Sequence, residues 1–274
     1  MMNRRTFLKT SAATAVGLPV AGACYGFAES TRVKIDRQSI SLPRLPVGFR
    51  GTTAAFLTDI HLGPFVSVDY VAAVVRTTMM LNPDLVLLGG DYSHRDGKYI
   101  APCFEVLARL SAPLGVYGVL GNHDYWHGLE ATRAGMRSAK VTELTNRGVW
   151  LQRAGGRLRL AGVDDLWEGR PDLSAALGDA RPTDACLLLS HNPDFAEALT
   201  DRRVGLVLSG HTHGGQVVVP GYGPPVVPSR YGQKYAHGLV EAPVTQVYVS
   251  AGIGMSGLPI RANCRPEITL ITLV

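Results

Sequence analysis

The chain has 274 residues, of which 46% are hydrophobic and 18% are charged, as in a globular protein with a sizeable core. Its formal charge is +5, but three of these positive charges (Arg4, Arg5 and Lys9) lie in residues 1–23, which contain no acid. The remaining +2, spread over the rest of the chain, is too small to indicate nucleic-acid binding.

The first 28 residues have the pattern of an export signal followed by the start of a linker. Two arginines, Arg4 and Arg5, precede a short apolar run that ends in Ala21-Gly22-Ala23, a small-residue cleavage pattern. This segment resembles a twin-arginine signal, which implies the twin-arginine export machinery as a partner and the periplasm or cell envelope as the location. Three fates remain open, namely cleavage after Ala23, lipidation at Cys24, and retention as a membrane anchor. A basic tail without an export role is the alternative.

The next segments predict one mixed domain. Residues 29–50 read as a linker or a peripheral strand, and residues 51–274 as the main domain. The first half of this domain alternates strand and helix patterns. The expected strands are Thr52–Thr58, Leu85–Leu88 and Leu114–Leu120, and the expected helices run from Ser67 to Leu81 and from Ile100 to Leu110.

The second half is richer in strands. A hairpin is expected at Val149–Arg153 and Arg157–Val163, where apolar and polar residues alternate on both sides of Gly155-Gly156. Further strands are expected at Cys186–Leu189, Val204–Leu208, Val217–Val219, Val247–Ser250 and Ile268–Leu273, with a Pro- and Gly-rich loop from Gly221 to Gly238. A βαβ half followed by a more antiparallel half predicts an α/β (α+β mixed) fold with two packed sheets and helices outside.

Polar residues gather where these apolar strands end. The strand-end positions are Asp59, Asp91, Asn122, His191 and His211. In α/β sheets, ligand sites form at the carboxyl ends of the strands, so these side chains are expected to meet in one crevice. Five of the eight histidines lie in these stretches, which scattered structural histidines would not do. Carboxylate, amide and imidazole ligands without thiolate suit Mn, Fe or Zn.

The order of the motifs is specific. They are Asp59-Ile60-His61, Gly89-Gly90-Asp91, Gly121-Asn122-His123-Asp124, the single His191, and Gly210-His211-Thr212-His213. From about Thr52 to the C-terminus, this order resembles the calcineurin-like metallophosphoesterases. The run Gly210–Gln216, with Gly252-Ile253-Gly254 and Pro266-Glu267-Ile268, is similar to their exported or membrane-associated branch of small bacterial phosphodiesterases.

The resemblance implies a four-layer αββα sandwich with a dinuclear metal site. One ion would take Asp59, His61, Asp91 and His213, and the other would take Asp91, Asn122, His191 and His211. Asp91 would therefore bridge two divalent ions. Such a pair can share a hydroxide for in-line attack on phosphorus.

His123 is the expected proton donor to the leaving oxygen, because it follows the ligand Asn122 and is not needed as a ligand itself. Some relatives place an aspartate three residues after the bridging aspartate, where it orients the catalytic histidine. Here that position is His94. Either Asp124 or a backbone carbonyl is then expected to orient His123.

Substrate contacts are expected from Arg230, Tyr231 and Arg261, since arginine offers two parallel donors to phosphate oxygens. Trp126 and His127 either line the mouth of the site or begin a helix.

The leading hypothesis is an exported, metal-dependent phosphodiesterase acting on a phosphate ester, with peripheral membrane association as an option. One alternative is a pyrophosphatase or phosphatase acting on lipid-linked or nucleotide-sugar precursors of the envelope. Another is a catalytically silent binding protein that keeps its metals for stability.

Overall fold

The computed structural model describes residues 25–274. The predicted export signal, including Cys24, therefore lies almost wholly outside the described residues. The described part begins with a helical segment over residues 25–29. No helix among residues 25–274 combines the length and the apolar character needed to cross a bilayer.

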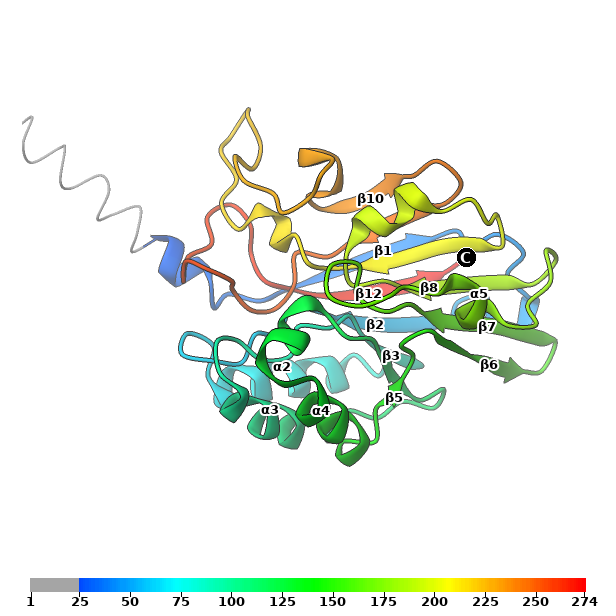
Figure 1. The fold of residues 1–274 in the computed structure, drawn as a ribbon, viewed down its shortest axis with the longest axis horizontal. Helices are drawn as coiled ribbons and strands as arrows, with labels where there is room; N and C mark the ends of the chain where they lie inside the picture. Colours follow the sequence, from blue (N-terminus) through cyan, green and yellow to red (C-terminus); the bar gives the residue numbers. More distant parts are fainter. Residues whose placement is uncertain (1–24) are drawn as a thin grey trace, which may run out of the picture.

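Two six-stranded mixed sheets form the centre of the molecule (Figure 1). The first has the strand order β1-β12-β2-β3-β4-β5. Its strands are β1 (Lys34–Ile40), β2 (Thr53–Leu57), β3 (Leu85–Leu88), β4 (Val116–Gly118), β5 (Thr142–Glu143) and β12 (Glu267–Leu273). Strands β2 to β5 pair in parallel, whereas β12 runs antiparallel to β2 and parallel to β1. Within residues 29–50, β1 is thus an edge strand.

The second sheet has the order β10-β11-β9-β8-β7-β6. Its strands are β6 (Arg147–Arg153), β7 (Gly156–Gly162), β8 (Ala185–Leu189), β9 (Val204–Ser209), β10 (Gly238–Glu241) and β11 (Gln246–Val249). Strands β6 and β7 form the expected antiparallel hairpin, and β7, β8, β9 and β11 are parallel neighbours. Parallel neighbours place their carboxyl ends at one edge, which is where the predicted ligands follow.

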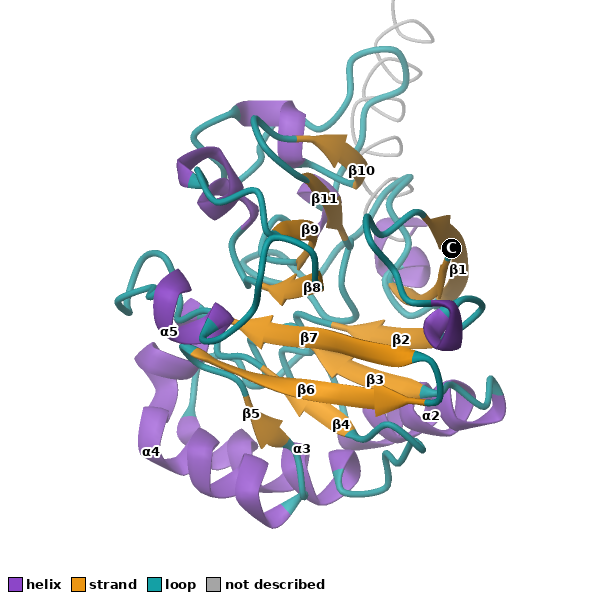
Figure 2. Cartoon of the chain, turned by 90° about the vertical axis from the view of Figure 1, so that its right-hand side faces the viewer, coloured by secondary structure: helices purple, strands orange, loops and turns teal. Residues whose placement is uncertain are grey.

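Alternation along the strands explains why the two sheets stack. In β2, Ala54 and Phe56 face the second sheet, whereas Ala55 and Leu57 belong to the core on the other side. Leu158, Leu187 and Leu206 of the second sheet complete the core between the sheets. A strand covered on both faces must be apolar throughout, as β3 is. Figure 2 shows the two sheets lying against each other.

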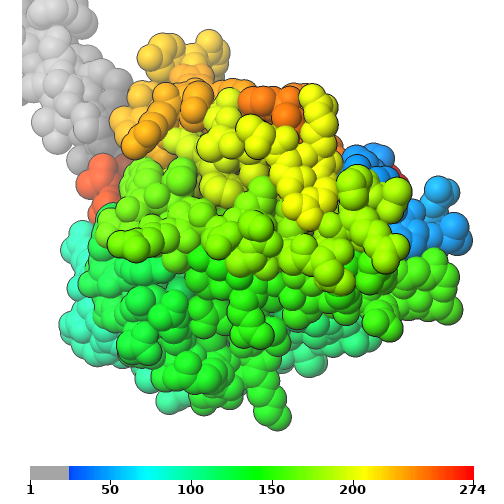
Figure 3. Space-filling view, turned by 45° about the vertical axis from the view of Figure 1, so that its right-hand side comes forward, coloured from blue at the N-terminus to red at the C-terminus, as the bar shows by residue number. Residues whose placement is uncertain are grey.

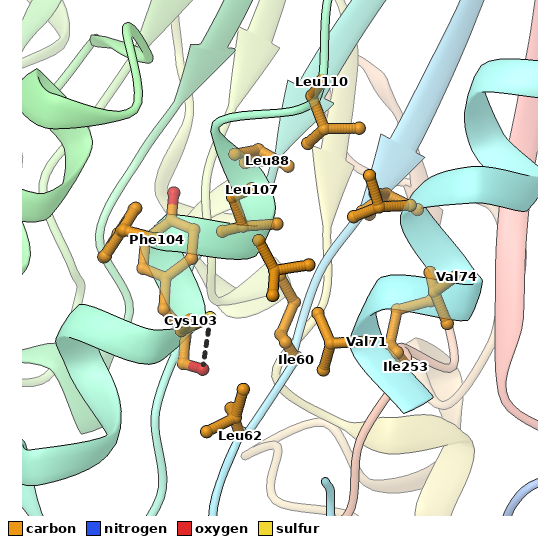
Figure 4. Close-up of a cluster of buried hydrophobic side chains, with 14 of the residues drawn as sticks. Ile60, Leu62, Val71, Val74, Leu88, Cys103, Phe104, Leu107, Leu110 and Ile253 are labelled. Carbon is orange, nitrogen blue, oxygen red and sulfur yellow. Dashed lines mark hydrogen bonds between the residues drawn. The ribbon is translucent and has the colours of Figure 1, made fainter. Parts of the chain in front are cut away.

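Three helices cover the outer face of the first sheet: α2 (Val68–Met80), α3 (Ile100–Leu107) and α4 (Asn122–Ser138). The hydroxyl of Ser67 caps α2 by accepting the N–H of Tyr70. Apolar side chains of α2 and α3 pack with Ile60 and Leu62, which directly follow β2 (Figure 4). This packing fixes the backbone of the segment that carries Asp59 and His61.

The outer face of the second sheet has a thinner cover. It consists of the short helix α5 (Leu173–Leu177) and the 3₁₀ helix η3 (Pro193–Ala198), packed on residues such as Leu188 and Val207. Figure 3 shows the yellow and orange segments of the second half resting on the green middle of the chain. The four layers confirm the predicted αββα sandwich.

Several predicted boundaries need correction. Val217–Val219 forms isolated bridges with Ala262 and Gly223 instead of a strand. The strand expected at Leu114–Leu120 is shorter in the structure, where only β4 forms. The second expected helix ends at Leu107 instead of Leu110. The Pro- and Gly-rich loop contains a 3₁₀ turn, η5 (Gly232–Tyr235), and the remaining 3₁₀ turns are η1 (Val47–Phe49), η2 (Gly97–Tyr99) and η4 (His213–Gly215). Tertiary contacts decide whether these short apolar segments pair as strands, and no local pattern encodes those contacts.

Candidate metal centre

The seven predicted ligands come together at the carboxyl ends of five parallel strands. Asp59 and His61 follow β2, Asp91 follows β3, and Asn122 follows β4. His191 follows β8, and His211 and His213 follow β9. All seven are buried, with exposed fractions of 5% or less. Residues up to 154 positions apart thus form one polar cluster beneath the surface.

The backbone is strained at most of these positions. Five of the seven adopt a positive φ of 49–68° although none is glycine: Asp59, His61, Asp91, His211 and His213. A left-handed conformation costs a non-glycine residue about 1–3 kcal/mol, and such strain gathers at functional sites. Backbone hydrogen bonds hold it in place, for example Asp59 N–H to Gly90 O and His61 N–H to Asp91 O, each at 3.0 Å.

One group of ligands surrounds the Nε2 atom of His61. This atom lies 3.1 Å from His213 Nε2 and 3.4 Å from Asp91 Oδ2. His213 Nε2 lies 3.3 Å from Asp59 Oδ1. The closest donor atoms of Asp59, His61 and His213 all lie within 4.8 Å of one another. The structure thus brings together the four residues expected for one ion.

The second group surrounds His191. Its Nε2 lies 3.3 Å from both Asp91 Oδ2 and His211 Nδ1. His211 Nδ1 in turn lies 3.0 Å from Asn122 Oδ1. On the other side of the ring, His191 Nδ1 lies 2.8 Å from Gly89 O, a carbonyl oxygen that can only accept a hydrogen bond. That contact keeps a proton on Nδ1, so Nε2 is the atom that faces Asp91 and that would bind a cation in place of a second proton.

The chemistry of the donors suits divalent metal. Burial alone would raise the pKa of Asp91, but the neighbouring His191 and His61 hold it well below its usual value, so the carboxylate stays charged. Burial also holds the pKa of His213 well below its usual value and lowers that of His211 to about 4, so both rings are neutral. The Nε2 atoms of His61 and His213 face each other at 3.1 Å, and two lone pairs at this distance repel unless a proton or a cation lies between them. A buried set of carboxylate, amide and imidazole donors without thiolate fits divalent metal.

Glycines allow the ligands to crowd. A Cβ atom on Gly121 would overlap the carboxylate of Asp91 and lie 2.8 Å from the ring of His191. A Cβ on Gly252 would come within 2.7 Å of Cβ of Asp59. These positions need glycine because the ligands occupy the space of a side chain.

A sequence profile of the calcineurin-like phosphoesterases matches residues 52–215, which contain all seven ligands. The chain belongs to the calcineurin-like phosphoesterase family. This family uses divalent metals, and the protein is a metal-dependent phosphoester hydrolase.

Three relatives are similar along most of the chain. The uncharacterized metallophosphoesterase YkuE of Bacillus subtilis (strain 168) is 35% identical over 280 residues, which cover 99% of this chain and 98% of that protein. The phosphodiesterase YaeI of Escherichia coli (strain K12) is 32% identical over 282 residues and covers both chains fully. A Danio rerio transmembrane protein with metallophosphoesterase domain is 32% identical over 267 residues, 92% of this chain and 60% of that protein.

A cavity of about 370 Å³ opens above the ligands of this phosphoesterase site. Asp91, Asn122, His211 and His213 contribute to its floor, and His123 lies on its wall. The ring of His123 stands 4.6 Å from that of His61, and its backbone N–H donates to Asp91 Oδ1 at 2.8 Å. Burial lowers the pKa of His123 to about 3, with His61 and His94 adding to the effect. The predicted acid therefore lies beside the predicted ligands, on the wall of the cavity.

Asp124 does not orient His123. Its buried carboxylate accepts the backbone N–H groups of Asp91, Tyr92 and Gly121 at 2.8–3.0 Å. Burial and the nearby Asp91 raise its pKa to about 7. Asp124 thus ties the loops after β3 and β4 together, which corrects the expectation of a catalytic role through His123.

Arg261 also has a different place from the predicted one. Its side chain is fully buried, with an exposed fraction of 0%. The guanidinium donates to carbonyl oxygens of Ala251, Gly254 and His213, among others. No surface of Arg261 is left for a substrate, so the prediction of a substrate contact is wrong. It instead joins the segment beside Asp59 to the backbone of a ligand.

Arg230 and Tyr231 are exposed on the loop that borders the cavity. The residues of this loop that line the cavity are Val226 and Pro228, and Arg230 and Tyr231 are not among them. Their predicted substrate contact stays a prediction.

Two aromatic residues complete the wall of the cavity. Trp126, on α4, packs its ring 4.7 Å from His123, and Trp167 stands 4.2 Å from His211. The sequence offered Trp126 as an option because of its position beside His123. No signal marked Trp167, which reaches the site from the loop after β7.

Proposed function

We propose that the protein is an exported phosphodiesterase that works with two divalent ions. The observation that carries this proposal is the position of Asp91 Oδ2, which lies 3.4 Å from His61 Nε2 and 3.3 Å from His191 Nε2. One carboxylate oxygen placed between two groups of ligands is the arrangement that a bridged pair of ions would require. When bound, such ions supply a nucleophile from water near neutral pH and positive charge for the phosphoryl oxygens.

The chain's own residues provide the remaining chemistry. His123 delivers a proton from Nε2 to the leaving oxygen as the bond between phosphorus and that oxygen breaks. The anionic phosphoester beside it favours the protonated imidazolium and offsets the effect of burial. Positioned proton donation contributes roughly 10²–10⁴ to the rate. Trp126 and Trp167 narrow the cavity and limit the water around the reacting group.

A substrate panel tests the preference for diesters. We expect the metal-loaded protein to hydrolyse phosphodiesters faster than the matching monoesters, in line with the phosphodiesterase named among its relatives. A strong preference for monoesters would reject this part of the proposal.

Two variants separate an enzyme from a silent binding protein. His123→Ala should keep its metal content and lose roughly 10²–10⁴ in turnover, because the side chain of His123 belongs to neither expected ligand set and its backbone N–H to Asp91 is retained. Asp91→Asn should lose metal together with activity. Unchanged rates in both variants would favour the silent binding protein.

A second candidate substrate is a lipid-linked envelope precursor with a phosphate or pyrophosphate group. The supporting observation is the apolar mouth of the cavity, where Trp126 and Trp167 are both about half exposed and Val226 is 73% exposed. Leu258, 66% exposed, follows the cavity residue Gly257. Such a rim suits a substrate with an acyl chain and peripheral contact with a membrane. Lipid pyrophosphates belong in the panel, and a clear preference for them over water-soluble diesters would support this candidate.

Export through the twin-arginine route remains part of the proposal because of Arg4, Arg5 and the short apolar run that follows. Mass spectrometry of the N-terminus of protein isolated from its host tests it. A mature chain beginning at Cys24 supports cleavage after Ala23, and a lipid mass on Cys24 supports lipidation. A full-length chain found only inside the cell would reject export.

A further inference from the structure

A second group of histidines surrounds the proposed acid. The Nδ1 atom of His123, on the side of the ring away from Nε2, has two histidine neighbours. His127 Nε2 lies 3.1 Å from it, and His94 Nδ1 lies 3.4 Å from it. Either neighbour could fix the orientation and the proton of His123, so the question is which one accepts a proton.

The backbone answers the question for His127. The N–H of Arg95, which can only donate, donates to His127 Nε2 at 3.0 Å. This nitrogen therefore carries a lone pair and no proton. A bare His123 Nδ1 facing it at 3.1 Å would place two lone pairs against each other. A proton on His123 Nδ1 removes the repulsion, and the lone pair of His127 Nε2 is then shared between the N–H of Arg95 and that of His123.

The same reasoning gives His94 the opposite character. The guanidinium of Arg95 donates from Nε to His94 Nε2 at 3.3 Å. Neutral His94 then carries its proton on Nδ1, the atom that faces His123. His94 thus offers a donor where an acceptor is needed, and its contact is also the longer of the two.

Local structure explains why His127 reaches this place. His123 and His127 lie four residues apart in the first turns of α4, so their side chains share one face of the helix. Gly128 follows with φ 143°, a conformation that favours glycine, and breaks the regular helix directly after His127. The packing leaves His127 half-buried between the helix and the loop that carries Arg95.

We propose that His127 is a positioning residue that accepts a hydrogen bond from the Nδ1–H of His123 and thereby keeps His123 Nε2 directed at the leaving oxygen. This inference rests on the proposed function of His123 as the acid. It assigns to a neutral histidine the role that a carboxylate has in some relatives.

The test uses full-length protein and two phosphodiesters that differ in their leaving group. An alkoxide leaving group needs a proton, whereas 4-nitrophenolate leaves without one. His127→Phe removes the acceptor, and we expect kcat for the alkyl diester to fall by about 10–100-fold, a part of the whole contribution of the acid. Metal content, KM and the rate with the nitrophenyl diester should stay close to those of the wild type.

Two matched variants complete the kinetic test. His127→Gln places an amide oxygen with two lone pairs near the same position, so it can accept from both Arg95 and His123 and should recover most of the lost rate. His94→Phe should change kcat for the alkyl diester and for the nitrophenyl diester by the same factor. Equal loss on both substrates in His127→Phe, or selective loss of the alkyl diester in His94→Phe alone, would overturn the proposal.

A second readout does not depend on activity. ¹⁵N NMR of the metal-free, full-length protein should show a protonated Nδ1 and a bare Nε2 on His123. In His127→Phe, the proton should no longer favour Nδ1 over Nε2. A protonated Nε2 with a bare Nδ1 in the wild type would also overturn the proposal. If the wild type cleaves no phosphodiester at all, the proposed function fails, whereas the NMR result still decides the role of His127.

Discussion

The Oδ2 atom of Asp91 lies 3.3 Å from Nε2 of His191, a ring whose other nitrogen is fixed by the carbonyl of Gly89. The same oxygen lies 3.4 Å from His61 Nε2. Asp91 is therefore the residue on which both ligand groups depend. Its charge is maintained even where burial opposes it, because two imidazoles lower its pKa.

Removing the charge of Asp91 should abolish the increase in the free energy of unfolding that a bound metal ion provides. For the wild type, Mn²⁺ at 100 times its dissociation constant should raise the free energy of unfolding by about 2.7 kcal/mol. In Asp91→Asn, the same addition should leave the melting temperature unchanged, because the shared charge is lost. Differential scanning fluorimetry with and without Mn²⁺ measures the shift. Asp69→Asn, an exposed change on α2, is the control that should keep the full shift. An equal shift in Asp91→Asn would show that the ions bind elsewhere.

The position of Gly121 gives a prediction that changes no ligand. Gly121 has φ −113°, which alanine adopts without strain, so Gly121→Ala acts only through the overlap of its Cβ with Asp91 and His191. We expect metal affinity to fall by at least about 100-fold, the upper range for residues that support metal ligands. Isothermal titration calorimetry measures it.

Gly51→Ala is the control for Gly121→Ala. Gly51 precedes β2, at the opposite end of that strand from Asp59, and its Cβ would meet nothing within 4 Å. Its positive φ of 79° makes alanine costly by about 1 kcal/mol, without a change in metal affinity. Normal affinity in Gly121→Ala would mean that the loop after β4 moves freely away from Asp91.

The sequence predicted which polar side chains meet because each of them closely follows an apolar strand. Asp59 and His61 alternate with Ile60 and Leu62, which belong to the core, so both ligands lie on the polar side as their two-residue spacing predicted, although their backbone is left-handed and not extended. The apolar runs Leu85–Leu88 and Ala185–Leu189 likewise marked buried strands whose ends had to meet at one edge. The same periodicity separated the two faces of each sheet.

The residues that were placed wrongly or missed lie where long loops return to the site. Arg261 looked like a phosphate-binding cation, but the fold of residues 251–264 encloses it among carbonyl groups. Trp167 reaches His211 from the loop after β7, with the two rings 4.2 Å apart. For His127 a signal existed, namely the four-residue spacing from His123. Its meaning depended on the contact with Arg95 N–H, which no local pattern encodes.

Arg261 should therefore affect stability and metal binding before it affects substrate affinity. Arg261→Gln leaves several buried carbonyl oxygens without donors, each at a cost of about 1–3 kcal/mol. We expect the free energy of unfolding to fall by about 3 kcal/mol or more, with weaker metal binding through His213. Urea denaturation measures the first effect and metal titration the second. Arg230→Gln, on the exposed loop, should change neither, and a raised KM with normal stability in Arg261→Gln would restore its role as a substrate contact.

Glu267 provides a stability prediction that depends on pH. It is fully buried at the start of β12, where it accepts from Ser250 and Ala251 and pairs with Lys34 and His237. Burial alone would raise its pKa, but His237 and Lys34 lower it from 4.5 to about 2. Between these two values the unfolded chain binds a proton that the folded chain does not bind. The stabilisation is therefore complete above about pH 4.5 and is lost as the pH falls toward 2.

Glu267→Gln should remove this contribution. A difference of about 2.5 pKa units corresponds to about 3 kcal/mol at pH 7. The variant should be less stable than the wild type by about that amount at neutral pH and should show a flatter decline in stability from pH 4.5 to 2. Urea denaturation across this range measures both effects, and Glu105→Gln, on the exposed side of α3, is the control. Lys34 of β1 and Ser250 after β11 both contact this carboxylate, so Glu267 joins the two sheets. An unchanged pH profile in Glu267→Gln would show that the charge of Glu267 is not needed to hold the sheets together here.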